Sequence, residues 1–227
     1  MWRKGDLDGR HRVAVVIHDS ALNPAIARDG SGRWLQDRPL VRSLTLAQLQ
    51  RYDVARLLMM LTSMTRGRLA IEVGALAGYS GIWLARGLQP GGRLITIEFE
   101  PKHAEFAREQ FEKAGVADRV EVRVGKALDV LPRLARDLAP ASVDVVFLDA
   151  EKTEYPDYWR IVRPLIAVGG LILADNVLGS GDWWIDAEGN ESRDAADRFS
   201  RLVANDRDLE SVAVPLRQGV LIGRRVR

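Results

Sequence analysis

The chain has 227 residues, of which 47% are hydrophobic, so it is long enough for one domain with a large core and too short for two of ordinary size. Its 33 Lys and Arg against 31 Asp and Glu leave a net charge of only +2, which argues against a nucleic-acid-binding protein. Cysteine is absent, which excludes disulfides, thiolate metal sites and a cysteine nucleophile. The only apolar run near the start is five residues long, so we expect neither a signal peptide nor a membrane segment, and a cytoplasmic location.

Residues 1–45 show no clear periodicity. A polar start is followed by VAVVI, which fits a short strand or a helical turn, and then by a stretch rich in turn-forming residues. We interpret this segment as an N-terminal arm or lid, and residues 46–227 as the main domain. From Leu46 to Met64 apolar residues recur every three or four positions, which predicts an amphipathic helix leading into the first strand of that domain.

The stretch from Leu69 to Gly81 predicts a buried strand, a tight glycine turn and a helix. Its glycines follow the pattern GxxxGxxG, and Leu76 stands where a dinucleotide-binding turn has its second glycine. This favours a nucleoside ligand without a pyrophosphate. Glu98 ends the next apolar run, about where a carboxylate binds ribose hydroxyls in such folds. A glycine turn with a later acid also occurs in sheets that bind nothing, so the pattern alone leaves both interpretations open.

The rest of the chain alternates strands and helices, which is typical of βαβ units. Further strands are expected at Arg93–Ile97, Arg119–Val124, Val143–Asp149, Gly170–Ala174, Ser211–Val214 and Gly219–Ile222, and further helices from Pro101 to Gly115, from Ala127 to Leu138, from Glu154 to Ile166 and from Ser192 onward.

Two of these strands end in oxygen donors: Asp149 after one, and Asp175 with Asn176 after the next. Ligands of open α/β sheets bind at this edge, and three oxygen donors without histidine or thiolate suit a hard cation such as Mg²⁺. Asp-Asn pairs are equally common as turn formers, so the pattern alone does not decide between a metal site and loop caps.

Lys152 lies three residues beyond Asp149, so both can face one site. A lysine beside a divalent cation loses proton affinity and can act as a general base, although most lysines are simply solvated. Trp183 and Trp184, in the long loop after Asn176, fit an aromatic wall over a flat substrate, loop anchors or a dimer interface.

Taken together, these residues resemble the cation-dependent O-methyltransferases, the family of catechol and caffeoyl-CoA O-methyltransferases and their bacterial relatives. The resemblance rests on five ordered blocks, which are EVGALAGYS (72–80), IEFEPKHAEFAR (97–108), AGVADRVEVRVGKALDVLP (114–132), FLDAEKTEY (147–155) and RPLIAVGGLILADNVLGSG (163–181). It implies an α/β fold: a Rossmann-like, doubly wound sheet of seven strands, mostly parallel with an antiparallel C-terminal strand, and helices on both faces.

The resemblance also implies the site residues. The S-adenosylmethionine contacts fall on Glu72, Gly74, Ala75, Tyr79, Ser80, Glu98, Ala127 and Asp149. The ligands of Mg²⁺, or of another divalent cation such as Mn²⁺ or Ca²⁺, fall on Asp149, Asp175 and Asn176. In the implied mechanism, which uses Asp149 and Lys152 as catalytic residues, the cation holds both oxygens of a vicinal diol and Lys152 takes a proton from one of them.

Several positions depart from the family pattern. Asp53 to Arg56 replace a Glu-Gln-Gly-Gln type sequence, Lys126 replaces an acid, DADK has become DAEK with Glu151, and Gln218 stands in place of a late Asp. None of these changes removes a predicted metal ligand or the predicted base.

We therefore predict an S-adenosylmethionine-dependent O-methyltransferase of a catechol-like or phenolic small molecule, working as a homodimer. Two alternatives stay open: methylation of a hydroxylated uridine in transfer RNA, which needs a phosphate-binding face, and a non-catalytic cofactor-binding protein. A NAD-dependent reductase fits poorly because of Leu76.

Overall fold

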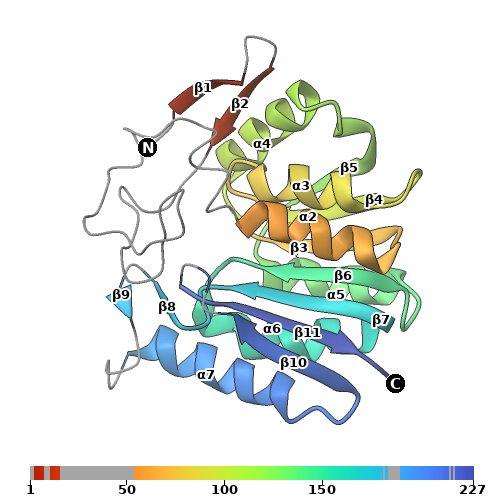
Figure 1. The fold of residues 1–227 in the computed structure, drawn as a ribbon, viewed down its shortest axis with the longest axis vertical. Coiled ribbons are helices and arrows are strands. Elements are labelled where there is room, and N and C mark those ends of the chain that lie inside the picture. The colour runs from red at the N-terminus through yellow and green to blue at the C-terminus, as the bar shows by residue number, and fades with distance from the viewer. Residues whose placement is uncertain are drawn as a thin grey trace, which may run out of the picture.

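The computed structural model describes residues 3–7, 11–15, 54–180, 182–183, 190–214, 216 and 218–227. Its centre is a sheet of seven strands: β3 (Leu69–Val73), β4 (Arg93–Glu98), β5 (Val120–Val124), β6 (Val143–Leu148), β7 (Ile166–Asp175), β10 (Leu209–Val214) and β11 (Val220–Arg225). Their order is β10-β11-β7-β6-β3-β4-β5 (Figure 1). The order places the ends of β3, β6 and β7 next to one another.

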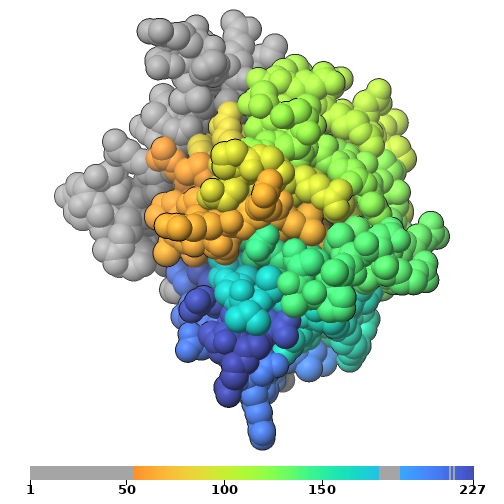
Figure 2. All heavy atoms as spheres, turned by 90° about the vertical axis from the view of Figure 1, so that its right-hand side faces the viewer, coloured from red at the N-terminus to blue at the C-terminus, as the bar shows by residue number. Residues whose placement is uncertain are grey.

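Strands β5, β4, β3, β6 and β7 pair in parallel, whereas β11 is antiparallel to both β7 and β10. This confirms the predicted mostly parallel sheet with an antiparallel C-terminal strand. The carboxyl ends of the parallel strands lie together on the left of Figure 1. Figure 2 shows the opposite end of the sheet, where α2, the beginning of β7 and the C-terminal strand reach the surface close together.

The helices are α2 (Val54–Thr65), α3 (Tyr79–Gly87), α4 (Pro101–Lys113), α5 (Ala127–Asp137), α6 (Tyr155–Val162) and α7 (Glu191–Ala204), with short 3₁₀ turns η3 (Ala117–Arg119), η4 (Lys152–Glu154) and η5 (Arg163–Leu165). Two small hairpins complete the described chain: β1 (Arg3–Leu7) with β2 (His11–Val15), and β8 (Gly179–Ser180) with β9 (Asp182–Trp183). None of the helices in the described part is long and apolar enough to cross a bilayer.

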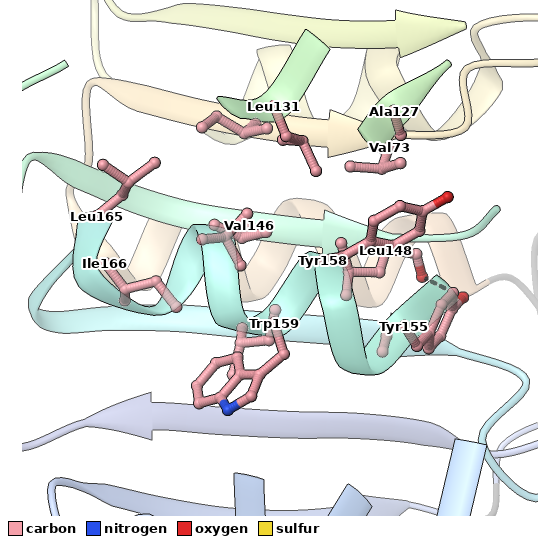
Figure 3. Packing of buried hydrophobic residues seen from close by; sticks show 14 of the residues in the cluster. Val73, Ala127, Leu131, Val146, Leu148, Tyr155, Tyr158, Trp159, Leu165 and Ile166 are labelled. Carbon is pink, nitrogen blue, oxygen red and sulfur yellow. Dashed lines mark hydrogen bonds between the residues drawn. The ribbon is translucent and has the colours of Figure 1, made fainter. Parts of the chain in front are cut away.

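The sheet separates two hydrophobic cores because successive strand residues point to opposite faces. In β3, Ile71 and Val73 join a cluster formed with α5, α6 and α7. Ala70 joins the other cluster, formed with α2, α3 and α4. Figure 3 shows part of the first cluster, with Val73 of β3 beside Ala127 of α5, and Trp159 of α6 next to the sheet. Both faces of the sheet are therefore covered by helices, as the fold prediction required.

The predicted helix from Glu154 to Ile166 is wrong over its last four residues. The α-helix ends at Val162, η5 follows, and β7 begins at Ile166, four residues before the predicted start at Gly170. Pro164 explains the difference, since it has no N–H to continue an α-helix. The chain after it is already extended, and Ile166 pairs with Val143 before a register shift in the ladder.

The other predicted elements are present with ends that move by a few residues. The predicted helix from Leu46 is observed from Val54, and its expected first part lies outside the described residues. In the same way, most of the predicted arm, residues 1–45, lies outside them. Within it, β2 covers three residues of the VAVVI run that fitted a short strand or a helical turn. Trp184 also lies outside the described residues.

Candidate active site

The turn after β3 requires the backbone freedom that its glycines supply. Gly74 and Gly78 have φ of 99° and 79°, in the left-handed region that disfavours side chains. A Cβ on Gly74 would lie 2.1 Å from the carbonyl oxygen of Asp149, so the turn approaches the loop after β6 directly. On Gly78, a Cβ would lie 2.9 Å from the ring of Phe111 in α4. The predicted strand, tight turn and helix are confirmed.

Glu72 lies on the face of β3 that α3 covers, and its side chain is completely buried. Its carboxylate accepts hydrogen bonds from the hydroxyls of Ser80, at 2.5 Å, and Thr96, at 2.6 Å. Burial raises the pKa of Glu72 to about 7, with smaller contributions from the charges of Asp149 and Glu98, although the two hydroxyls act in the opposite direction. Glu72 therefore fastens α3 to the sheet, and its contact with a cofactor stays a prediction.

Glu98 is the last residue of β4, and its carboxylate contacts the backbone of the glycine turn after β3. Its carboxylate accepts the backbone N–H of Leu76 at 2.7 Å and that of Glu100 at 2.9 Å. Leu76 has a φ of 45°, so this leucine adopts the backbone conformation that a glycine would favour. His103 lies beside the same carboxylate, with Nδ1 3.6 Å from Oε1. Glu98 thus stands at the rim and holds the glycine turn in place.

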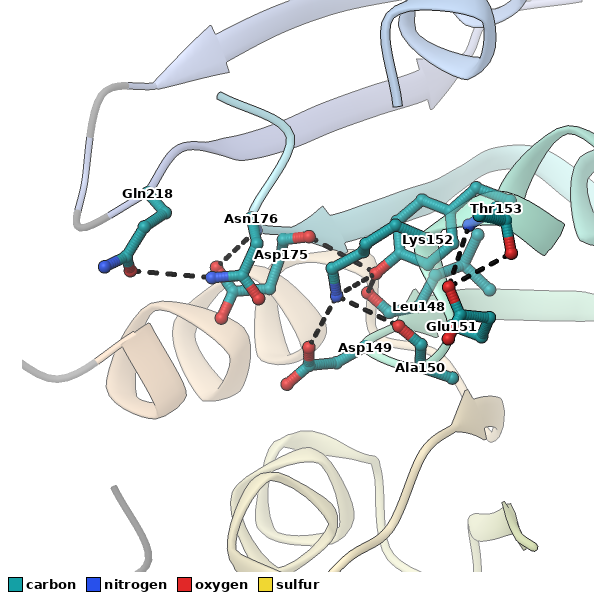
Figure 4. Close-up of polar contacts among 10 residues, drawn as sticks. Leu148, Asp149, Ala150, Glu151, Lys152, Thr153, Asp175, Asn176 and Gln218 are labelled. Atoms are coloured by element: carbon teal, nitrogen blue, oxygen red, sulfur yellow. Dashed lines mark hydrogen bonds and ion pairs between the residues drawn. The ribbon is translucent and has the colours of Figure 1, made fainter. Parts of the chain in front are cut away.

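The oxygen donors of β6 and β7 also meet at this rim (Figure 4). Asp149 directly follows β6, and its side chain is 39% exposed, whereas Asp175 at the end of β7 is buried. One carboxylate oxygen of Asp175 accepts the backbone N–H of Asn176 at 2.9 Å, so this acid does shape its own turn. Asn176 has a φ of 59°, and its amide nitrogen lies 3.5 Å from Oε1 of Gln218.

Lys152 points its amino group into the gap between these strand ends. Nζ lies 3.1 Å from Oδ1 of Asp149, 3.2 Å from the carbonyl oxygen of Ala150 and 2.8 Å from the hydroxyl of Tyr155 (Figure 4). Burial opposes the positive charge, but Tyr155 and the carboxylates of Asp149 and Asp175 outweigh it and raise the pKa of Lys152. Lys152 is thus an ammonium here, and neutralising the two carboxylates would remove two of the influences that raise its pKa.

The donor set suits a hard cation. Within the described residues no three side chains of His, Cys, Asp or Glu gather at metal-binding distance. The predicted set has two carboxylates, Asp149 and Asp175, and the amide oxygen of Asn176 as its third donor. Proteins usually hold Mg²⁺ with few ligands, all of them oxygen, and leave its other coordination positions to water or substrate oxygens. Asp149, Asp175 and Asn176 therefore fit the predicted cation.

Comparison with known proteins agrees with this geometry. A family model described as O-methyltransferase matches residues 39–226. The catechol O-methyltransferase of Mycobacterium tuberculosis is 39% identical over 209 residues, covering 92% of this chain and 88% of that protein. The catechol O-methyltransferase of Niastella koreensis is 42% identical over 126 residues, a match that spans 56% of this chain and 57% of that relative. The chain belongs to the O-methyltransferase family.

Solved structures of the family superpose on most of the chain. An O-methyltransferase from Bacillus cereus, in complex with SAH, is 35% identical with a TM-score of 0.69, covering 76% of this chain and 80% of that one. TomG from Streptomyces achromogenes, involved in tomaymycin synthesis, was solved with SAM. It is 33% identical with a TM-score of 0.70, covering 81% of this chain and 82% of that one. The predicted class, an S-adenosylmethionine-dependent O-methyltransferase, is confirmed at the level of the family, as is the Rossmann-like fold.

The remaining predicted cofactor residues of this family member lie near the glycine turn and the neighbouring helix. Ala75 is buried in the turn, Tyr79 and Ser80 are half-buried in the first turn of α3, and Ala127 is buried at the start of α5. Their roles stay predictions.

Three exposed apolar residues surround Glu98, and the sequence analysis missed two of them, Phe99 and Val124. Phe99 follows Glu98 and is 62% exposed, Val124 pairs with Glu98 across the ladder, and Leu76 donates its N–H to it. Exposed apolar side chains around a polar anchor suit one flat ring of a nucleoside. The signal for Phe99 and Val124 was their position at strand ends, where an apolar residue has no buried face to fill.

Proposed function

We propose that this O-methyltransferase transfers the methyl group of S-adenosylmethionine to one hydroxyl of a catechol-like small molecule. Asp149, Asp175 and Asn176 would hold a divalent cation, and Lys152 would be the general base. The observation that supports this best is the position of Lys152, whose Nζ lies 3.1 Å from Oδ1 of Asp149, between the ends of two adjacent strands that supply the oxygen donors. The names of the two catechol O-methyltransferase relatives agree with the substrate class.

The cation, when bound, would hold both oxygens of a vicinal diol and lower the pKa of one hydroxyl. The protein's own contribution begins with Lys152. Neutralising Asp149 and Asp175 would remove two of the influences that raise the pKa of Lys152; burial then favours the uncharged amine, while Tyr155 still favours the ammonium. Lys152 can then accept the hydroxyl proton at Nζ. The O–CH₃ bond forms as the S–CH₃ bond breaks, leaving S-adenosylhomocysteine, the methyl ether and a proton on Lys152.

The cofactor would lie along the rim from the glycine turn to Glu98. Ligands of open α/β sheets bind at this edge, where the turn at Gly74 lies against the loop after β6, and Glu98 suits the ribose hydroxyls. Phe99, Val124 and Leu76 would contact the base. Methyl transfer needs no covalent enzyme intermediate, since positioning and charge neutralisation suffice.

The test is methyl transfer from labelled S-adenosylmethionine to caffeic acid and a panel of catechols, first with Mg²⁺ and then with EDTA. We expect turnover that EDTA abolishes and that added Mg²⁺ restores. Turnover that survives EDTA would overturn the cation-assisted mechanism. Binding of S-adenosylmethionine without turnover on any catechol would overturn the substrate class and favour transfer RNA or a non-catalytic role. Sedimentation of the same sample tests the proposed homodimer.

A further inference from the structure

Tyr155 is fully buried, yet its hydroxyl lies at the centre of the site. It lies 2.8 Å from Nζ of Lys152, 2.9 Å from the carbonyl oxygen of Leu148 and 3.2 Å from that of Asp175. Leu148 is the last residue of β6, directly before Asp149, and Asp175 is the last residue of β7. One hydroxyl therefore contacts the proposed base and the ends of both strands that supply proposed ligands.

The hydroxyl has a single proton, which determines the direction of these bonds. The ammonium of Lys152 has only donors, so it donates to the phenolic oxygen. The phenolic proton then goes to a carbonyl, and the carbonyl oxygen of Leu148 is the nearer of the two. Deleting the hydroxyl would leave the carbonyl of Leu148 without this donor and Lys152 with two acceptors in place of three.

The ring of Tyr155 is held firmly by the core. It packs edge-on against Phe199 of α7, with ring centroids 5.3 Å apart. The ring centroid of Tyr158, which Figure 3 also shows, lies 6.1 Å from that of Tyr155. Of the three acceptors around Nζ, Asp149 is on a side chain that is 39% exposed, and Ala150 is in the loop after β6. The phenolic oxygen is the acceptor that the packed core holds in place.

We propose that Tyr155 is a positioning residue for the methyl-transfer reaction: its hydroxyl fixes Nζ of Lys152 and the ends of β6 and β7 in the arrangement that proton transfer requires. This inference rests on the function proposed above. A flexible lysine side chain without this acceptor would sample positions away from the substrate hydroxyl, and misplacement by about 1 Å costs roughly a hundredfold in rate.

The first test is Tyr155→Phe, which removes the hydroxyl and keeps the ring. Tyr158→Phe is the matched control, because it removes another buried hydroxyl of the same helix whose partner is Glu154. We expect Tyr155→Phe to lower kcat on catechol by about tenfold to a hundredfold while KM for S-adenosylmethionine is unchanged, and Tyr158→Phe to retain kcat. Unchanged kcat in Tyr155→Phe would overturn the proposal.

A double-mutant cycle with Lys152→Met distinguishes positioning from a general structural effect. If Tyr155 acts through Lys152, adding Tyr155→Phe to Lys152→Met causes no further loss in single-turnover rate. A full, additive loss would show that the hydroxyl acts on the fold rather than on the base, and would reject the assignment.

A third measurement needs neither activity nor a stable Tyr155 variant. The sequence has five lysines, so ¹⁵N-lysine labelling gives a simple spectrum in which Lys152 is assigned by its loss in Lys152→Arg. We expect its ammonium protons to exchange slowly in the wild-type chain. Fast exchange would overturn the proposed fixation of Nζ, whereas slow exchange without catechol turnover would support it and reject only the proposed substrate class.

Discussion

The carboxylate of Glu98 accepts the backbone N–H of Leu76 at 2.7 Å, and this bond joins the end of β4 to a turn in which a leucine has a φ of 45°. A left-handed conformation costs a residue with a Cβ about 1 kcal/mol or more. The hydrogen bond to Glu98 offsets part of that cost, since bonds to charged groups are the stronger ones. The chain therefore keeps an apolar side chain, 41% exposed, at the rim where a glycine would be easier to accommodate.

Comparing Leu76→Gly with Leu76→Ala tests this interpretation. Both variants lose the apolar side chain, but only glycine relieves the backbone strain, so we expect the glycine variant to be more stable by about 1 kcal/mol in urea unfolding. At a residue with ordinary φ the order would be the reverse. Both variants should bind S-adenosylhomocysteine more weakly than the wild type in calorimetry. Equal stability of the two variants would argue against strain at this position.

Replacing Glu98 by Gln should weaken cofactor binding. The amide keeps the size but loses the charge that would favour hydrogen bonds from ribose hydroxyls, so we expect Kd for S-adenosylhomocysteine to rise by about tenfold to a hundredfold, corresponding to roughly 1.5–3 kcal/mol. The control is Glu100→Gln, because Glu100 caps α4 through Lys102 N. Similar losses in both variants would show a general effect of negative charge at this rim, not a specific role of Glu98.

The buried carboxyl of Glu72 predicts a pH-dependent stability. Its pKa is raised from 4.5 to about 7 in the folded chain, mainly by burial, so between these values the folded state holds more protons than the unfolded state. The contribution of Glu72 to the free energy of unfolding is therefore fully present below pH 4.5. It is lost as the pH rises from 4.5 through 7, which lowers the free energy of unfolding by roughly 3 kcal/mol if this group acts alone.

The variant Glu72→Gln isolates this contribution, since an amide does not titrate. We expect urea unfolding to show it more stable than the wild type at pH 8, with the advantage absent or reversed at pH 5. A stability difference that is the same at both pH values would contradict a raised pKa at Glu72.

Substitutions of Lys152 separate its charge from its basicity. Lys152→Met should lower kcat by about a hundredfold to ten-thousandfold, the usual contribution of general base catalysis. Lys152→Arg should not restore the rate, because a guanidinium keeps its proton in proteins. Cofactor affinity, measured by calorimetry, should stay near the wild-type value in both. An active Lys152→Arg enzyme would show that a positive charge, and not a base, is needed here.

Much of this architecture could be predicted from the sequence because the patterns involved are local. The apolar run from Val143 to Leu148, the glycines after β3, the acids that end β4 and β7 and the acid that follows β6 were all visible along the chain. Parallel strands put their carboxyl ends at one edge, so Glu98, Asp149 and Asp175 could be assigned to a common rim without coordinates. Pro164 was equally visible, but its effect on the helix before β7 was missed.

Only the tertiary structure decided what each side chain contacts. Glu72 and Glu98 are acids on the same face of adjacent strands, because Glu72 pairs with Thr96, two residues before Glu98. Glu72 lies within β3 and bonds Ser80 of α3, whereas Glu98 is the last residue of β4 and stands at the rim. Tyr155 looked like an ordinary helix residue until folding placed its hydroxyl 2.8 Å from Lys152. Sequence periodicity specifies which face of an element is buried, because that depends on neighbours within one element. Hydrogen bonds between elements depend on register, packing and loop geometry summed over the whole chain, so they are determined only when the chain is folded.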